Sequence, residues 1–262
     1  MVKEVTSFTA LCNRLDALDR NDPNWKYQAA ELFDRLAESE QKAEDPSGCW
    51  DFHAERALDV LASDGTVCVR PIREGDKDFF NAVRMQWSSP IRLMGEELPK
   101  TPHYWPETQK WRSFYCISER LADHMPLGYI AIKDTRKGLW ELAFEFDKQH
   151  CHQGYGGPSI GLFLREIERR TGVSQYQARV YPDNIPCQKC LEKIGAILAG
   201  ICDGDILKTE ESKKFCEEHM LDSIDDHMRL LAERIHVPAR KLLSNVLDYR
   251  LYPSDFHIFS GY

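Results

Sequence analysis

Residues 139–170 constrain the fold most, because they place a strand, a glycine-rich turn and a helix in immediate succession. An apolar stretch ends near Phe146, and a turn containing Gly154, Gly156 and Gly157 leads directly into a periodic helix. A helix N-terminus exposes unpaired backbone N–H groups and the positive end of the helix dipole, and glycines let a ligand approach that backbone closely. The segment therefore predicts an anion site suited to a diphosphate.

Two other nucleotide-binding motifs share this strand, turn and helix, but neither fits. A dinucleotide-binding turn has a third glycine where this sequence has Ser159, and its strand opens a parallel βαβ unit. Here the apolar runs at 114–117, 127–132 and 139–146 predict strands, and the short turn before the last predicts an antiparallel hairpin. The lysine of a P-loop is missing from the turn.

The rest of the chain divides into three parts by its periodicity. Apolar spacing predicts helices over residues 1–62, the last at about 50–61, and a charged helical stretch over 209–235. Between them strands and helices alternate. The predicted elements are a strand at 67–72, a helix to about 85, a helix at 157–170, a strand at 175–180, a helix at 185–194, a strand at 196–201 and a last strand at 245–252. We therefore expect an N-terminal helical extension (1–62) and one domain (63–262) with a helical insertion at about 205–242.

Composition excludes several classes of protein. The formal net charge is −8 and no basic surface is visible, which argues against a nucleic-acid partner. No apolar run approaches the ~18 residues of a membrane span, and the N-terminus lacks the apolar core of a secretory signal. Nine cysteines, an odd number, fit reduced thiols, so we expect a cytoplasmic protein without a membrane partner.

Two cysteine-containing segments invite a metal or redox interpretation. Cys187 and Cys190 have C-x-x-C spacing, but no second Cys or His pair lies at zinc-finger distance. His150, Cys151 and His152 are consecutive on a turn, and adjacent side chains rarely converge on one ion. We expect no metal; Cys187 and Cys190 are two thiols one helical turn apart, with a redox pair as the alternative.

The turn Cys151-His-Gln-Gly-Tyr-Gly156 resembles the Q/R-x-x-G-x-G/A turn of the GNAT acyltransferase superfamily, with cysteine at the first position. Two further features follow the same pattern: Asn184 opens a helix, and Gly195, eleven residues on, precedes the next strand. The opening of the domain, residues 69–76, is also similar. The resemblance covers about 66–201. It implies an α+β fold with a mixed, mostly antiparallel sheet flanked by helices, and transfer of an acetyl group from acetyl-CoA to an amine.

The resemblance also implies which residues hold the cofactor. The strand ending in Phe144, Glu145 and Phe146 would supply backbone hydrogen bonds to the pantetheine and the acyl carbonyl. Asn184 would contact the cofactor arm or orient its helix. The pyrophosphate would lie on the turn formed by Cys151, His152, Gln153, Gly154, Tyr155, Gly156 and Gly157. Cysteine at the first position removes one side-chain contact, which predicts weaker affinity.

The chemistry needs a base, because an alkyl amine with a pKa near about 10.4 is mostly protonated at neutral pH. Glu141 and Glu145 share one face of their strand, since side chains repeat with period two. We prefer Glu141 slightly, because an acidic residue often opens this strand in related families; either carboxylate could instead be exposed or paired with a cation. The tyrosine that many members use as general acid is replaced by Leu191, which leaves Tyr181 and Cys190 as nearby substitutes.

The acceptor and the partners are the least constrained part of this prediction. Four aromatic residues lie where the family usually builds its acceptor pocket: Trp87, Tyr104, Trp105 and Trp111. They could stack on a cationic amine or simply form core. The acceptor is an amine of a small molecule or a protein, and a homodimer is possible. The rival hypothesis is a non-catalytic acyl-CoA-binding sensor or protein-interaction module on the same fold, motivated by Cys151 and Leu191.

Overall fold

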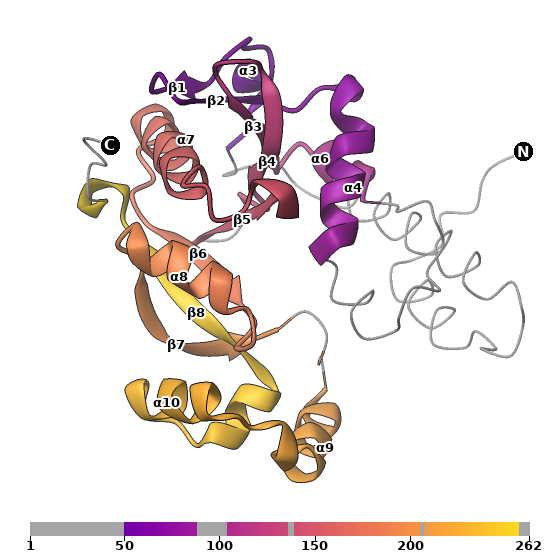
Figure 1. Ribbon diagram of the computed structural model, residues 1–262, viewed down its shortest axis with the longest axis vertical. Helices are drawn as coiled ribbons and strands as arrows, with labels where there is room; N and C mark the ends of the chain where they lie inside the picture. Colours follow the sequence, from indigo (N-terminus) through magenta and orange to yellow (C-terminus); the bar gives the residue numbers. More distant parts are fainter. Residues whose placement is uncertain (1–49, 88–103, 136–138, 205–206, 208, 257–262) are drawn as a thin grey trace, which may run out of the picture.

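A single eight-stranded sheet organises the computed structural model, which describes residues 50–87, 104–135, 139–204, 207 and 209–256 (Figure 1). The strand order is β1-β2-β3-β4-β5-β6-β8-β7. β5 and β6 run parallel, whereas the other neighbouring strands of this sheet run antiparallel. The strands are β1 (Ala62–Ser63), β2 (Val67–Pro71), β3 (Phe114–Arg120), β4 (Met125–Ile132), β5 (Trp140–Phe146), β6 (Tyr176–Val180), β7 (Ile197–Asp203) and β8 (Asn245–Leu251). The predicted mixed, mostly antiparallel α+β fold is confirmed.

Helices cover both faces of the sheet (Figure 1). The α-helices are α3 (His53–Arg56), α4 (Lys77–Trp87), α6 (Trp105–Thr108), α7 (Gly156–Thr171), α8 (Ile185–Lys193), α9 (Glu210–His219) and α10 (Asp226–Arg234). Short 3-10 helices are η1 (Glu74–Asp76), η2 (Lys148–His150), η3 (Leu221–Ser223), η4 (Ala239–Leu243) and η5 (Pro253–Asp255). α7, α8 and α10 pack into one core, and α4 and α6 pack into a second. None of the helices in the described ranges is long and apolar enough to cross a membrane.

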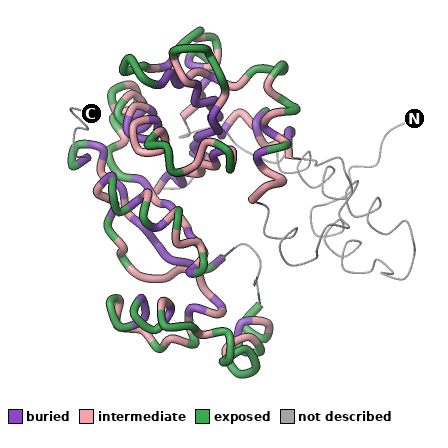
Figure 2. Tube along the Cα trace, in the orientation of Figure 1, coloured by how far each residue is buried: buried purple, intermediate pink, exposed green. Residues whose placement is uncertain are grey.

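The two cores use alternate side chains of the same strands, as the period of a strand requires. Figure 2 shows the buried residues following the strands, with exposed residues on the outer sides of the helices. Along β5, Trp140, Leu142 and Phe146 enter the larger core beneath α7. The intervening side chains of Glu141 and Glu145 therefore point to the opposite face, where α4 packs against β4 and β5. Glu141 and Glu145 thus lie on the same face of β5, as the alternation of side chains along a strand predicts.

The parallel strands β5 and β6 pair over a very short distance. Their register contains only Trp140 opposite Tyr176 and Glu141 opposite Gln177. On its other side β5 stays paired with β4 as far as Phe146. The backbone of β5 beyond Glu141 therefore lacks a strand partner on the β6 side, and an unpaired strand edge offers N–H and C=O groups to an extended ligand.

The N-terminal boundary differs in detail from the helical prediction. The helix expected at about 50–61 is only the single turn α3, and β1 follows it as an edge strand. Phe52, just before α3, is fully buried and stacks on Phe114 of β3, with ring centroids 4.6 Å apart. Burial against the sheet overrides helical propensity here, so residues 50–63 pack with the main core. The division of the chain at residue 62 stays a prediction, and residues 1–49 of the predicted extension lie outside the described residues.

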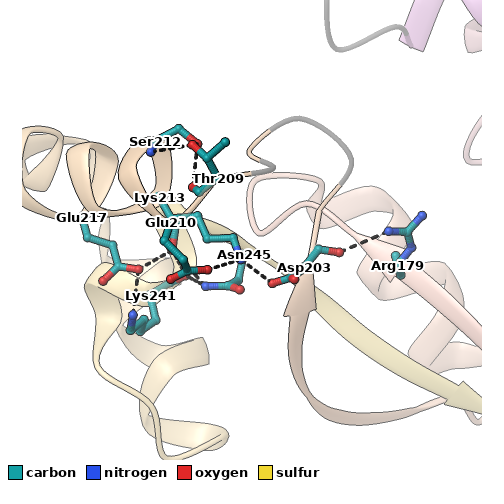
Figure 3. A network of polar contacts seen from close by, with 10 residues as sticks. Arg179, Asp203, Thr209, Glu210, Ser212, Lys213, Glu217, Lys241 and Asn245 are labelled. Atoms are coloured by element: carbon teal, nitrogen blue, oxygen red, sulfur yellow. Dashed lines mark hydrogen bonds and ion pairs between the residues drawn. The ribbon is translucent and has the colours of Figure 1, made fainter. Parts of the chain in front are cut away.

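The helical stretch predicted at 209–235 consists of α9 and α10, separated by η3. Asp225 is the N-cap of α10, because its side chain accepts a hydrogen bond from the Met228 N–H, 2.7 Å away. Polar contacts attach this insertion to the end of the sheet (Figure 3). Lys213 of α9 binds Asp203 of β7 at 2.7 Å, and Glu217 binds Lys241 of η4 at 2.9 Å. Lys213 thus holds the insertion to β7, whereas Glu217 joins α9 to η4, the short helix directly before β8.

Candidate active site

The glycine turn begins directly after β5 and ends in α7. Two residues of the turn have a left-handed backbone, His152 with φ 62° and Gly154 with φ 88°. The first hydrogen bond of α7 runs from the Ser159 N–H to the Tyr155 carbonyl, at 3.1 Å. The N–H groups of Gly156 and Gly157 therefore precede the helical ladder, as an anion site requires.

Contacts on both sides stiffen this turn. Asp147 accepts a hydrogen bond from the Gln149 N–H at 2.8 Å, and Gln86 of α4 accepts one from the Lys148 N–H at 2.9 Å. The thiol of Cys151 donates to the Asp147 carbonyl, with Sγ and O 3.5 Å apart. The cysteine that replaces the family's Gln or Arg thus bonds to the end of the strand, and its contribution to the turn is local.

The start of α7 meets α8 and β5 at Gly156. A Cβ atom there would lie 3.4 Å from Sγ of Cys190 and 3.7 Å from the ring of Phe146. Burial raises the pKa of Cys190 to about 11, and burial also raises that of Cys187, so both thiols are neutral near pH 7. In the described part of the chain no group of three metal-ligating side chains converges. Cys187 and Cys190 lie one turn apart on α8, as expected.

α8 is oriented by Asn184, which caps it by accepting a hydrogen bond from the Cys187 N–H at 3.2 Å. Both roles predicted for Asn184, contact with the cofactor arm or orientation of its helix, stay predictions; the structure shows the N-cap contact. Leu191, at the position of the family tyrosine, is fully buried in the larger core. Gln188 lies between α8 and the insertion, and its Oε1 is 3.1 Å from Nε2 of His227 on α10. Packing thus explains the leucine, and this position offers no proton donor.

Glu141 lies where β5 and β6 separate. Only 3% of its side chain is exposed, and it forms ion pairs of 2.9 Å with both Lys133 and Arg179. Burial alone would raise the pKa of Glu141, but the two cations outweigh it and hold the pKa below its usual range. A carboxylate so stabilised in its charged form is a weak base. These contacts favour a structural role for Glu141, joining the end of β4 to β6.

We expect Glu141→Gln to destabilise the fold by about 2 kcal/mol, because it removes the carboxylate that neutralises the largely buried Arg179. The half-exposed Lys133 and the hydrogen bond from Arg179 to the Asp203 carbonyl limit the loss. The pKa of Glu141 is depressed, so its stabilisation is present above the unfolded-state pKa of about 4.3 and is lost as the pH falls through the lower folded-state value. Urea unfolding at several pH values measures this. The exposed pair of Glu218 and Lys214 provides the control: Glu218→Gln should change stability by less than about 0.5 kcal/mol. Equal losses in the two variants would contradict the structural role.

Glu145 has a different environment on the same strand face. Its Oε1 accepts a hydrogen bond from Nη1 of Arg84 on α4, at 2.6 Å. Its Oε2 is buried and makes no hydrogen bond of good geometry with any described group, although the Tyr129 hydroxyl is close enough to interact. Burial raises the pKa of Glu145, and the opposing effect of Arg84 does not cancel it. A carboxylate with a raised pKa and one oxygen that lacks a hydrogen bond of good geometry suits a proton acceptor.

Sequence reasoning missed Arg84, because its partner is 61 positions away along the chain. The only local signal was the position of Arg84 on the helix, directly after Val83 and four residues after Phe80, which are the two buried residues of α4. Arg84 also lies 4.7 Å above the ring of Tyr104. The four aromatic residues predicted for the acceptor pocket have different surroundings. Tyr104 contacts Arg84, whereas Trp105 is buried in the core beneath α4. Trp87 donates from Nε1 to the Phe146 carbonyl at 2.7 Å, and Trp111 is half-buried.

Comparison with known proteins agrees with this arrangement. The sequence model of the acetyltransferase (GNAT) domain matches residues 66–197, which is half of the chain. Among solved structures, a putative ribosomal-protein-serine acetyltransferase from Vibrio cholerae is similar at a TM-score of 0.50 and 11% identity, over 74% of this chain and 97% of that chain. A GNAT-family acetyltransferase from Bacillus anthracis has a TM-score of 0.49 and 13% identity, over 74% and 99%. At such identities the likeness concerns the fold.

The chain belongs to the GNAT acetyltransferase family. The prediction of a GNAT-type enzyme that transfers an acyl group is confirmed by the family match, and the match gives the rival sensor or interaction module no support. The match begins at residue 66, just before β2, and ends at the start of β7. It therefore contains β5, the glycine turn, α7 and α8, the elements that carry the residues of the candidate site.

Proposed function

We propose that this enzyme transfers an acetyl group from acetyl-CoA to an amine, with the cofactor lying between β5 and β6 and its pyrophosphate on the start of α7. The observation that carries the proposal is the short pairing of β5 and β6, which leaves the β5 edge open directly before the glycine turn. An extended pantetheine is a suitable partner for such an edge. The diphosphate would then meet the N–H groups of Gly156 and Gly157, where the helix dipole favours negative charge.

Each residue of the site has a role in this proposal. Backbone groups of Phe144, Glu145 and Phe146 bind the pantetheine arm and the acyl carbonyl. The rest of the cofactor site is the turn from Cys151 to Gly157, with Asn184 fixing the position of α8. Cys151 contributes through the shape of the turn, because its thiol is bonded to the strand end.

Glu145 is the proposed proton acceptor, in preference to Glu141. The acceptor amine arrives protonated, donates a proton to Oε2 of Glu145, and its nitrogen then attacks the thioester carbonyl. Bound acetyl-CoA supplies that electrophilic carbonyl and a thiolate leaving group. Arg84 holds the carboxylate in position through Oε1 and leaves Oε2 for the amine. The proton lost when the new amide forms is available to the departing thiolate, so the transfer balances without a metal or a redox partner.

Titration of the purified protein with acetyl-CoA, following heat and melting temperature together, tests the proposal. We expect saturable binding with a rise in melting temperature, because a ligand that binds only the folded state stabilises it by mass action. Absence of binding at millimolar acetyl-CoA would contradict the proposal and favour a module that has lost its ligand. A cytoplasmic location, a homodimer and the absence of nucleic-acid partners stay predictions.

A further inference from the structure

Three buried polar atoms, one on the proposed base and two on the helix beside it, make no hydrogen bond of good geometry with any described residue. They are Oδ1 of Asn81, Nε of Arg84 and Oε2 of Glu145. An unsatisfied buried polar atom costs about 1–3 kcal/mol, so most buried polar groups in native proteins are paired. Three of them at one place are therefore costly to the empty protein, and a ligand that pairs with them recovers this cost.

The three atoms belong to one side of the site. Arg84 and Glu145 are in direct contact, 2.6 Å apart. Asn81 lies one turn before Arg84 on α4, and residues three apart on a helix are neighbours on its surface. The side chains of Arg84 and Glu145 are 24% and 17% exposed, so each keeps an accessible part.

The hydrogen-bonding capacity of these atoms defines a chemical class. Oε2 of Glu145 accepts from the amine that is to be acetylated. Nε of Arg84 is a donor and needs an oxygen, whereas Oδ1 of Asn81 is an acceptor and needs an N–H. A carbonyl and an N–H together form a secondary amide. In an α-amino amide one carbon atom separates the amine from the carbonyl carbon. The amine and the carbonyl are therefore close enough together to bind Glu145 and Arg84, which are in direct contact.

Resting on the proposed function, we propose that the acceptor is an α-amino amide, with its amine on Glu145, its carbonyl on Arg84 and its amide N–H on Asn81. The N-terminus of a peptide and a small amino-acid amide both carry this chemistry. A polyamine lacks the carbonyl and would bring further positive charge towards the Arg84 guanidinium. The Glu107 carboxylate, which interacts with Tyr115 and Arg84, is the group that a polyamine would use instead.

The test compares acceptors on the unmodified enzyme. Alanine N-methylamide, alanine methyl ester, isopropylamine and spermidine are each supplied with acetyl-CoA. The value of kcat/KM is corrected for the fraction of protonated amine, the form that binds Glu145, because an α-amine has a lower pKa (about 7.7–8.0) than an alkylamine. We expect the amide to exceed the ester, which lacks the N–H, by at least about tenfold, because a site built to bond a group rejects the analogue that lacks it. A tripeptide amide used better than alanine N-methylamide would identify a peptide; the reverse would identify a small molecule.

The variant Asn81→Ala tests the assignment of the N–H. It should remove most of the amide-to-ester ratio, whereas Asp78→Asn, an exposed position on the same helix, should preserve it. If Asn81→Ala lowers the melting temperature too far for assay, the comparison of acceptors on the unmodified enzyme still decides. Equal use of all four amines, or preference for spermidine, overturns this inference alone. Failure to bind acetyl-CoA overturns the proposed function with it.

Discussion

We expect Gly156→Glu to abolish acetyl-CoA binding, with at least a 100-fold loss of affinity. The substitution places a carboxylate at the first residue of α7, where the cofactor's diphosphate would otherwise lie, and like charges repel at this short range. Isothermal calorimetry with acetyl-CoA measures the loss, and the melting temperature of the free variant shows whether it folds.

Two further variants separate charge from volume in this prediction. Gly156→Ala adds only a Cβ atom, 3.4 Å from Sγ of Cys190, which is an ordinary contact. It should therefore retain most of the affinity. Gly75→Glu introduces the same charge in η1, where a Cβ atom meets nothing within 4 Å. That variant should bind like the unmodified enzyme. Unchanged affinity in Gly156→Glu would show that the glycine turn is not the diphosphate site.

Replacing Glu145 by glutamine is expected to lower kcat by about 10²–10⁴-fold, the usual contribution of a general base. The amide keeps the shape of the side chain and cannot accept the proton. The dissociation constant of acetyl-CoA should stay within about threefold, because the cofactor is held mainly by backbone groups. A low kcat together with an unchanged dissociation constant would show that the variant is folded and has lost catalysis alone. Turnover equal to that of the unmodified enzyme would remove Glu145 from the mechanism.

The pH profile gives an independent test of Glu145. The base must be ionised to accept a proton, and burial raises its pKa, so kcat/KM should fall on the acid side at a pH above the ordinary carboxyl value of about 4.3. Residual activity of Glu145→Gln should lack this acid limb. Glu141→Gln should retain it, because the depressed pKa of Glu141 lies outside this range. Loss of the limb in Glu141→Gln would assign the base to Glu141.

The contrast between these two carboxylates shows where sequence reasoning stops. Period-two alternation places Glu141 and Glu145 on the same strand face, and the structure follows it. Burial raises the pKa of both carboxylates, but Lys133 and Arg179 outweigh burial at Glu141, whereas Arg84 does not outweigh it at Glu145. Arg179 and Arg84 come from separate elements, β6 and α4, so no local pattern pairs them with either carboxylate.

The residues adjacent in sequence were sufficient to predict the elements that we propose to hold the cofactor. Gly154, Gly156 and Gly157 predict the turn and the start of α7, because positive φ and an exposed helix N-terminus are properties of a few adjacent residues. Asn184 likewise predicts the cap of α8. The prediction of a helix at about 50–61 was wrong beyond the single turn α3, because the burial of Phe52 against Phe114 is a contact between distant segments that local sequence does not reveal.

The sequence alone determined the strand, turn and helix of the proposed anion site, the order of the elements and the family, because periodicity, glycine and capping act within a few residues. The tertiary structure decided how soon β5 and β6 separate, how Glu141 and Glu145 are paired, and which buried polar atoms of α4 and β5 lack a hydrogen bond. Those properties depend on the burial and charge that packing creates between segments far apart in the chain, as Arg84 and Glu145 illustrate.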